Sequence, residues 1–385
     1  MQVEKISEIC VSYHGNEVGR IRKDSGKCVF EYSRQWLKNG FSVSPLDLPL
    51  ENKLFTAPDT GPAGNFGVFN DSLPDGYGLY LIDRMLRRDG GSILDLDQMQ
   101  LMSIVGSSGM GALEYSPVID ILEPEDKTDS TDFDLLQKKA WDILSEADDS
   151  DASLLYYNSG NSGGARPKKL YTDADGRHWL IKFRHLSDPV NIGALEHRYS
   201  LAAKASGIIV PETKLVSGKY FASERFDLDK DGTRLHTVTA AGILGVDFRA
   251  QTADYTNLLA LTGYLTQDPA QVEQMFRLMV FNVVSLNKDD HAKNFSFIYR
   301  EGAGRGSAGR EPSGWELAPA YDLTYSPQGT RGEHSTSVFF NGNPGLEDIL
   351  RAGTGIRIHR KRCLEIIEEI QGVCREHLDH IQPIL

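Results

Sequence analysis

The apolar residues in the second half of the chain change their spacing near residue 233. Between residues 151 and 232 most of them alternate as in strands, for example over 179–183, and one helical stretch covers 192–205. From residue 233 to the C-terminus the helical period dominates, most clearly over 358–380. This order predicts an α+β protein with a small β-rich lobe over 151–232 and a large helical lobe over 233–385.

A further unit precedes the two lobes, over residues 1–119. Its short apolar runs are separated by turn residues such as Gly15 and Asn16, which is typical of antiparallel strands. The predicted elements of this unit are strands over 9–13, 18–21 and 28–32 and a helix over 75–88. We therefore expect a β-rich accessory subdomain in front of a bilobal fold.

The negative charge of the chain is concentrated in one short stretch. The whole chain carries 41 Lys and Arg residues against 54 Asp and Glu residues, but residues 116–150 alone hold 3 basic and 11 acidic residues. We interpret residues 120–150 as an acidic linker. Its second half predicts a short amphipathic helix, because Phe133, Leu136 and Ala140 recur at helical spacing. A net charge of −13 makes the chain a poor candidate for binding nucleic acid by its whole surface.

The sequence contains no signal for export or for a membrane anchor. The longest apolar stretch, over 275–284, is interrupted by Arg277 and Asn282, and the first residues lack the basic and apolar layout of a signal peptide. The four cysteines form no C-x-x-C pair and no metal-ligand spacing. These features predict a cytoplasmic protein with reduced thiols and no membrane partner.

The most informative motif is the polar segment 287–295, with the sequence NKDDHAKNF. Asp289 and Asn294 are five positions apart, which is the D-x-x-x-x-N spacing of a kinase catalytic loop. In such a loop the Asp orients or deprotonates the attacking hydroxyl and the Asn binds Mg²⁺; Asp290 does not fit the spacing. Downstream, Asp322 suits a second ligand, because one or two carboxylates and phosphate oxygens usually hold Mg²⁺. The spacing alone is a weak signal.

The predicted small lobe contains residues suited to phosphate binding. Lys182 is the only charged residue in the apolar strand 179–183, where a buried ammonium needs an anionic partner; the alternative is an edge lysine that reaches solvent. A nucleotide phosphate and Glu196 of the next helix would supply that partner, although Glu196 also suits a solvated helix face. A glycine-rich segment precedes the strand, and its backbone amides can approach phosphates with a lysine as a point charge. The residues expected in this role are Gly163, Gly164, Ala165 and Lys168.

The order of these features is stronger evidence than any one of them. Glu224 and Phe226 end the β-rich lobe, at the position where a kinase hinge meets adenine through backbone groups. A bilobal kinase requires these features in a fixed order, and the chain has them in that order: glycine-rich loop, strand Lys, helix Glu, hinge, catalytic loop and metal Asp.

The segments 163–168 (GGARPK), 289–295 (DDHAKNF) and 321–323 (YDL) closely resemble HipA-type serine/threonine kinases, the toxins of bacterial HipA/HipB pairs. The N-terminal unit resembles the accessory subdomain of the same family, in Leu73-Pro74-Asp75-Gly76 and in the GALEY run over 111–115 among others. The resemblance covers nearly the whole chain. It implies phosphoryl transfer from ATP with Mg²⁺ to a protein serine or threonine, for which aminoacyl-tRNA synthetases are family targets, and hence growth arrest and persistence. It also implies a HipB-like helix-turn-helix antitoxin as partner, with DNA bound through that antitoxin.

The resemblance assigns roles residue by residue. It implies that Lys182 holds the nucleotide phosphates and Asp289 is the catalytic Asp, with Asn294 and Asp322 as metal ligands. The supporting residues that it adds are His236, His291 and Lys293. We interpret His291 as a brace of the catalytic loop, and the alternative for His236 is a core histidine.

One position departs from the family. The autophosphorylated serine of the glycine-rich loop aligns with Asn161, so the candidate autophosphorylation sites here are the flanking Ser159 and Ser162. Two other functions stay open from the sequence: a catalytically dispensable co-repressor that binds the antitoxin on DNA, and a lipid or small-molecule kinase. Intact Lys182, Asp289, Asn294 and Asp322 argue against the first of these.

Overall fold

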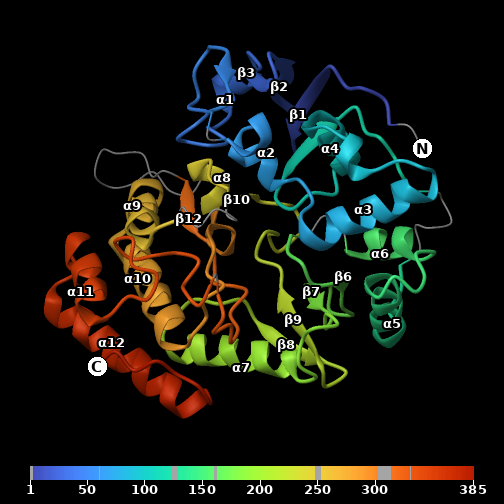
Figure 1. Ribbon diagram of the computed structural model, residues 1–385. Helices are drawn as coiled ribbons and strands as arrows, with labels where there is room; N and C mark the ends of the chain where they lie inside the picture. The colour runs from blue at the N-terminus through green and yellow to red at the C-terminus, as the bar shows by residue number, and fades with distance from the viewer. Residues whose placement is uncertain are drawn as a thin grey trace. The chain divides into compact units, whose positions relative to one another are not determined.

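The structure is a computed structural model that describes residues 3–59, 61–122, 129–159, 163–247, 253–301, 314–329 and 331–385. The chain divides into two compact units (Figure 1). Unit 1 contains Met1–Gly193 and Leu215–His236, and unit 2 contains Ala194–Lys214 and Thr237–Leu385. Among the described residues, no helix is both long enough and apolar enough to cross a membrane.

Unit 1 begins with an antiparallel five-stranded sheet in the order β4-β3-β2-β1-β5. Alternate residues of β1 are buried, as the apolar alternation of its sequence predicts. The strands are β1 (Glu8–Tyr13), β2 (Asn16–Asp24), β3 (Lys27–Tyr32), β4 (Phe55–Thr56) and β5 (Leu113–Ser116). The α-helices of this part are α1 (Trp36–Asn39), α2 (Gly67–Asp71), α3 (Gly76–Arg88) and α4 (Gln98–Val105).

The rest of unit 1 is a four-stranded sheet, in the order β6-β7-β9-β8, with two helices. Its elements are α5 (Phe133–Leu144), α6 (Ala152–Ser159), β6 (Lys168–Thr172), β7 (His178–Lys182), β8 (Thr213–Val216), whose first two residues belong to unit 2, and β9 (Tyr220–Glu224). Leu81 of α3, Ala140 of α5, Leu155 of α6 and Ile181 of β7 belong to one buried apolar cluster. The predicted accessory subdomain and small lobe therefore share a continuous hydrophobic core.

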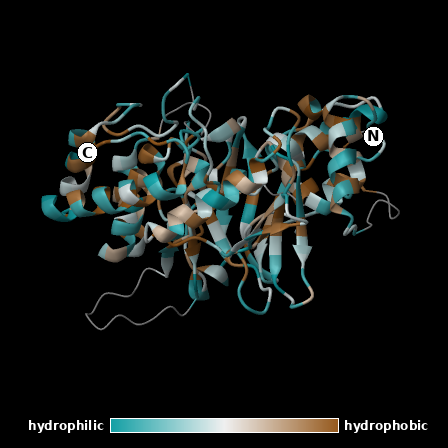
Figure 2. Ribbon diagram, turned by 90° about the horizontal axis from the view of Figure 1, so that it is seen from below, coloured by the Kyte–Doolittle hydropathy of each residue, from teal (hydrophilic) through white to brown (hydrophobic). Residues whose placement is uncertain are grey.

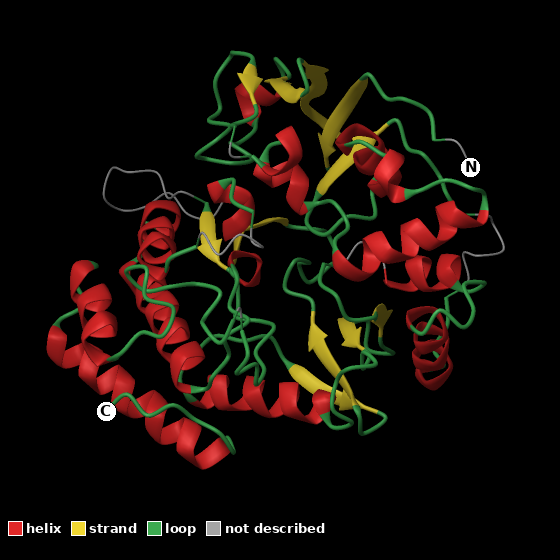
Figure 3. Cartoon of the chain, viewed as in Figure 1, coloured by secondary structure: helices red, strands yellow, loops and turns green. Residues whose placement is uncertain are grey.

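Unit 2 is mainly helical, as the red ribbons of Figure 3 show. Its helices are α7 (Ile192–Ala205), which begins two residues before the unit, α8 (Ala240–Leu244), α9 (Tyr255–Thr266), α10 (Pro269–Val284), α11 (Leu346–Gly355) and α12 (Arg360–His377). Helix α10 is buried from Met275 to Val284 and packs against both α9 and α12. A small sheet in the order β10-β11-β12 completes the unit, with β10 (His236–Thr239), whose first residue belongs to unit 1, β11 (Ser296–Tyr299) and β12 (Trp315–Leu317).

Most predicted elements are present in the structure. Helix α7 has the predicted bounds, and the predicted strands in the first 32 residues correspond to β1, β2 and β3. The predicted large helical lobe is present, and within it the segment from 318 to 345 contains no helix in its described residues. Figure 2 shows hydrophobic and hydrophilic residues on different sides of several helices. This amphipathic pattern is what made the helices predictable from the sequence. The low-complexity segment 302–309 lies outside the described residues.

Candidate active site

The glycine-rich segment of unit 1 forms an exposed turn before β6. Gly163, Gly164 and Ala165 are all exposed, and Gly164 has φ +98°, a conformation that favours glycine. The side of the turn nearer β6 is anchored by Arg166, whose Nε and Nη2 donate to the two carboxylate oxygens of Asp188 at 2.8 and 3.0 Å. Burial raises the pKa of Asp188, but hydrogen bonds from Arg166 and from the His185 amide outweigh it and lower that pKa. The turn is therefore exposed, and its base is held by a bidentate ion pair.

Two lysines lie directly opposite each other beside this turn. Lys168, the first residue of β6, pairs in register with Lys182, the last residue of β7. The Nζ atom of Lys168 lies 2.6 Å from where a Cβ on Gly164 would be, and the Nζ of Lys182 lies 5.5 Å from the centre of the Phe221 ring. Like charges at directly opposite positions of an antiparallel pair are destabilising. The pair is therefore suited to an anion with more than one charge, such as a polyphosphate.

The predicted hinge lies at the end of β9. Glu224 is the last residue of that strand and is paired in register with Trp179 of β7. Both Glu224 and Phe226 are half-buried. Between them, Arg225 is fixed by a two-point ion pair with Asp227, at 3.0 and 2.7 Å. The chain thus leaves the sheet here in a defined conformation.

In unit 2, the segment that follows α10 contains two adjacent aspartates that lie in different environments. Asp289 is exposed, whereas Asp290 is only 1% exposed. The Oδ2 atom of Asp290 accepts the hydroxyl of Tyr255 at 2.7 Å and Nδ1 of His334 at 2.9 Å, and its Oδ1 accepts the backbone N–H of Thr336 at 3.2 Å. Asp290 is thus a structural brace, and Asp289 is the carboxylate that a reactant can reach.

The two candidate metal ligands are positioned by hydrogen bonds near them. Nδ2 of Asn294 donates to the carbonyl oxygen of Asp289 at 2.7 Å, which leaves Oδ1 as the amide atom suited to a cation. The hydroxyl of Tyr321 donates to the carbonyl oxygen of Lys293 at 2.6 Å. Tyr321 precedes Asp322, and Lys293 precedes Asn294, so this bond links the chain beside one candidate ligand to the chain beside the other. The donor set is an amide oxygen and a carboxylate, which suits a hard cation such as Mg²⁺.

The backbone of Asp322 has φ +58°, which is uncommon for a residue with a side chain. Such conformations cost free energy and occur often at functional sites. Downstream, Ser326 keeps this segment on the catalytic loop: its Oγ accepts the Asp289 amide at 3.1 Å and donates to Oδ1 of Asn287 at 3.1 Å. A parallel bridge between Asn287 and Ser326 adds backbone pairing.

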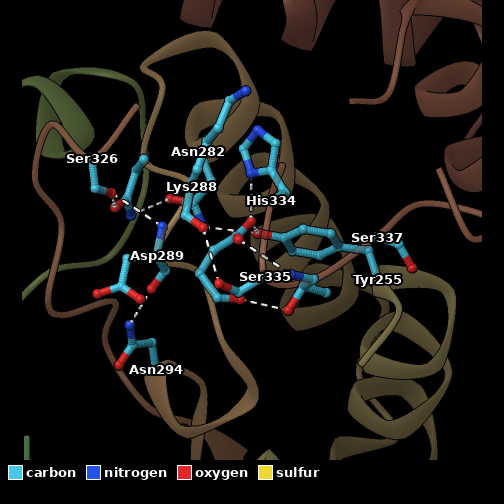
Figure 4. Close-up of polar contacts among 12 residues, drawn as sticks. Tyr255, Asn282, Lys288, Asp289, Asn294, Ser326, His334, Ser335 and Ser337 are labelled. Atoms are coloured by element: carbon cyan, nitrogen blue, oxygen red, sulfur yellow. Dashed lines mark hydrogen bonds and ion pairs between the residues drawn. The ribbon is translucent and has the colours of Figure 1, made fainter. Parts of the chain in front are cut away.

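A continuous chain of polar contacts connects the catalytic loop to α9 and α10 (Figure 4). Asn282, in the otherwise apolar part of α10, donates through Nδ2 to the hydroxyl of Tyr255 at 2.9 Å and accepts Nδ2 of Asn287 at 3.0 Å. Burial raises the pKa of Tyr255, as does the charge of Asp290, so that its hydroxyl stays protonated and keeps donating. The loop therefore rests on α9 and α10 through buried hydrogen bonds.

Lys288 fixes the loop on its other side. Its Nζ donates to the carbonyl oxygen of Gly332 at 2.7 Å and to Oδ1 of Asn343 at 2.9 Å. The carbonyl oxygen of Lys288 accepts the amide of Ser335 at 3.0 Å and its hydroxyl at 3.1 Å. Figure 4 shows Lys288 and Ser335 among these contacts. The segment after the candidate metal ligand and the catalytic loop thus form one hydrogen-bonded body within unit 2.

The structure places three of the predicted supporting residues in unit 2. Glu196 lies in α7 and is 2% exposed; Lys182 belongs to unit 1, so their pairing stays a prediction. His291 is half-buried, and its carbonyl oxygen accepts the Asn294 amide at 2.8 Å, in the short 3₁₀ turn Ala292–Asn294. Lys293 is half-buried beside it, with the carbonyl contact to Tyr321 already described.

His236 lies in a core of unit 1. Its Nε2 carries the hydrogen and donates to the carbonyl oxygen of Val43 at 2.8 Å, and its ring lies 5.4 Å from that of Phe41. Burial lowers the pKa of His236 to about 4, although the bond to Val43 opposes this. This environment is that of a neutral core histidine, the alternative that the sequence left open.

Of the two candidate autophosphorylation sites, Ser159 is among the described residues. Ser159 is the last residue of α6, is 3% exposed, and donates to the carbonyl oxygen of Tyr156 at 3.3 Å. Ser162 lies outside the described residues.

Sequence reasoning missed several residues that hold these parts in place. Asn282 had a usable signal, because an amide in an otherwise buried helix needs a partner. Lys169 is 1% exposed and pairs with Asp129 and, at 2.8 Å, with Oδ1 of Asn158, yet it looked like an ordinary charge next to Lys168. Nothing in the sequence pattern connected His334 to Asp290, because the two residues lie 44 positions apart in the chain.

Comparison with known proteins identifies the class and then the family. A chain of the HipA, HipB and operator DNA complex of Shewanella oneidensis matches with a TM-score of 0.66 and 18% identity, over 97% of this chain and 92% of that chain. The likeness confirms the predicted α+β, kinase-like bilobal fold. The HipA-like C-terminal domain model matches residues 160–378, more than half of the chain, and the HipA N-terminal domain model matches residues 9–116. The chain belongs to the HipA family of kinases.

Curated relatives agree with this membership. The serine/threonine-protein kinase toxin HipA of Shewanella oneidensis is 24% identical over 349 residues, which is 80% of this chain and 72% of the relative. The putative kinase Y4dM of Sinorhizobium fredii is 27% identical over 188 residues. That second match spans 44% of this chain and 42% of the relative, so the chain covers less than half of that protein.

Proposed function

We propose that the protein is an ATP- and Mg²⁺-dependent serine/threonine protein kinase that acts as the toxin of a toxin–antitoxin pair. The observation that carries the proposal is the contrast between Asp289 and Asp290. Asp290 is buried and serves as a structural brace, whereas Asp289, at kinase spacing from Asn294, is exposed and can meet a substrate.

In unit 1, the proposed role is to hold the nucleotide. Lys168 and Lys182 neutralise phosphate charge, and the exposed backbone of Gly163 and Ala165 donates to phosphate oxygens. The chain at Glu224–Phe226 contacts adenine through backbone groups, which requires no particular side chain. In this arrangement a triphosphate relieves the repulsion between the two opposed lysines.

In unit 2, the proposed role is phosphoryl transfer. Asp289 orients the hydroxyl of a serine or threonine and accepts its proton as the oxygen attacks the γ-phosphorus, while the bond to the β-phosphate oxygen breaks and ADP leaves. Asn294 and Asp322 hold Mg²⁺, which supplies positive charge to the phosphate oxygens when it is bound. The buried contacts of Asp290 and Asn282 keep Asp289 in place without rearrangement at the moment of reaction.

The proposed biological setting follows from the family. The related Shewanella structure contains HipA, HipB and operator DNA, so we propose a HipB-like helix-turn-helix antitoxin as partner and DNA contact through that antitoxin. A translation component such as an aminoacyl-tRNA synthetase is the proposed target, which connects the activity to growth arrest.

The test is phosphosite mapping in a dephosphorylated bacterial lysate incubated with the purified protein, ATP and Mg²⁺. New phosphoserines or phosphothreonines are expected with the wild-type protein and not with Asp289→Ala. The proposal fails if the wild-type protein adds no sites, or if Asp289→Ala adds the same ones. Labelled lipid or small-molecule products without protein phosphosites would support a different kinase activity.

A further inference from the structure

The first turn of α3 and the glycine-rich turn are in direct contact within unit 1. The backbone N–H of Gly164 donates to Oδ1 of Asp75, and the carbonyl oxygen of Gly164 accepts the backbone N–H of Tyr77 at 3.0 Å. Asp75 and Tyr77 belong to the segment matched by the HipA N-terminal domain, and Gly164 to the segment matched by the HipA-like C-terminal domain. Both backbone groups of one loop residue are therefore used by the other domain.

This contact replaces the usual cap of a helix. Asp75 is the N-cap residue of α3, a position where an Asp normally accepts an amide of its own helix. Here its side chain makes no such bond, and the second helical amide, that of Tyr77, turns to Gly164 instead. The helix terminus and the loop thus exchange two hydrogen bonds of opposite direction, and the 7% exposure of Asp75 keeps water away from the exchange.

The start of α3 and the glycine-rich turn approach each other so closely that glycine is favoured on both sides of the contact. A Cβ on Gly76 would lie 2.6 Å from the carbonyl oxygen of Gly164, and both glycines have positive φ, +40° and +98°. The base of the contact is rigid, because Tyr77 is 4% exposed and Leu81 is fully buried in the shared core of unit 1. A loop held at one residue in this way has fewer conformations to lose when a ligand binds.

We propose that Asp75 is a positioning residue that holds the glycine-rich loop in its nucleotide-binding conformation. This inference rests on the proposed function. Since the Gly164 amide is taken by Asp75, the amides of Gly163 and Ala165 and the ammonium of Lys168 are the phosphate donors of the loop. The N-terminal domain therefore takes part in nucleotide affinity without touching the nucleotide.

The test measures the affinity of the full-length protein for the imido analogue of ATP with Mg²⁺, by calorimetry. Asp75→Ala is expected to weaken binding about tenfold, because a hydrogen bond to a charged group is lost. Asp75→Asn keeps an acceptor oxygen and is expected to stay within about threefold of the wild-type protein. Asp89→Ala, at the exposed opposite end of α3, is the matched control and leaves affinity unchanged. At saturating ATP the transfer rate of Asp75→Ala stays within about twofold of wild type, which separates positioning from catalysis.

Amide hydrogen exchange at single-residue resolution gives a readout that does not depend on activity. In the wild-type protein the Gly164 amide is expected to exchange more slowly than that of Ala165, and Asp75→Ala is expected to remove the difference while β7 stays protected. Equal exchange at the two amides in the wild-type protein overturns the proposal even if Asp75→Ala does not fold. Unchanged affinity in a folded Asp75→Ala protein also overturns it. A wild-type protein that binds no nucleotide refutes the proposed function instead.

Discussion

At the scale of single residues, the two adjacent carboxylates of the catalytic loop have separable tasks. Asp289→Ala removes an exposed side chain, so the free energy of unfolding is expected to change by no more than about 0.5 kcal/mol. Asp290→Ala leaves the buried donors of Tyr255, His334 and Thr336 without their acceptor, and a loss of about 3–5 kcal/mol is expected. Urea denaturation of both variants checks the difference. Equal destabilisation by the two substitutions would contradict the assignment of Asp290 as the brace.

A second residue-scale prediction concerns pH and His236. Burial lowers the pKa of this histidine to about 4, below the ordinary value of 6.5, so the unfolded chain takes up a proton at a higher pH than the folded one. Its contribution to stability is complete above pH 6.5 and is lost as the pH falls from 6.5 towards 4. Between pH 7.5 and pH 5 we expect a loss of about 2 kcal/mol. Urea denaturation at both values checks this, and His236→Gln, which cannot take up a proton there, should lose much less. The same pH dependence in both proteins would rule out His236 as its source.

At the scale of elements, the opposed lysines of β6 and β7 predict how strongly nucleotide stabilises the protein. Lys182→Met removes the charge of one of the two opposed lysines and keeps most of its side-chain length, so the melting temperature without nucleotide is the reference for each protein. The increase in melting temperature that Mg²⁺ and an ATP analogue cause should be largely lost, because binding to the folded state is weakened. Thermal denaturation with and without nucleotide measures both. Lys230→Met, in an exposed turn, is the matched control. A full nucleotide-induced increase in Lys182→Met would contradict the phosphate role.

Elements with a strong period were predictable from the sequence, and irregular ones were not. Helix α7 was predicted at about its observed bounds because the apolar stripe with Leu195, Tyr199 and Ala202 repeats at helical spacing. The apolar residues of the segment from 318 to 345 show no regular spacing. Its described part is held by side-chain contacts such as His334 with Asp290 and Lys288 with Asn343, which no periodic pattern predicts. The motif spacing identified Asp289, but only the fold shows why Asp290 differs from it. Likewise, Asp75 was noted within a family motif, and its contact with Gly164 depends on tertiary packing.

At the scale of the whole molecule, the net charge of −13 predicts how DNA binding depends on a partner. Phosphate contacts require basic groups, and an acidic surface repels the duplex. The isolated protein is therefore expected to give no mobility shift with operator DNA at physiological salt, whereas its complex with a helix-turn-helix antitoxin should. The assay compares the protein alone, the antitoxin alone and the complex. A salt-dependent shift by the protein alone would contradict this prediction.

The central claim is phosphoryl transfer that depends on Asp289. Its most direct measurement is the rate at which labelled γ-phosphate moves from ATP to protein, for the wild-type protein and for Asp289→Asn, with nucleotide affinity measured in parallel. Loss of the residue that accepts the hydroxyl proton is expected to lower the rate by about 10²- to 10⁴-fold while affinity for the nucleotide changes little. Equal rates for the two proteins, or no transfer by the wild-type protein, would contradict the account.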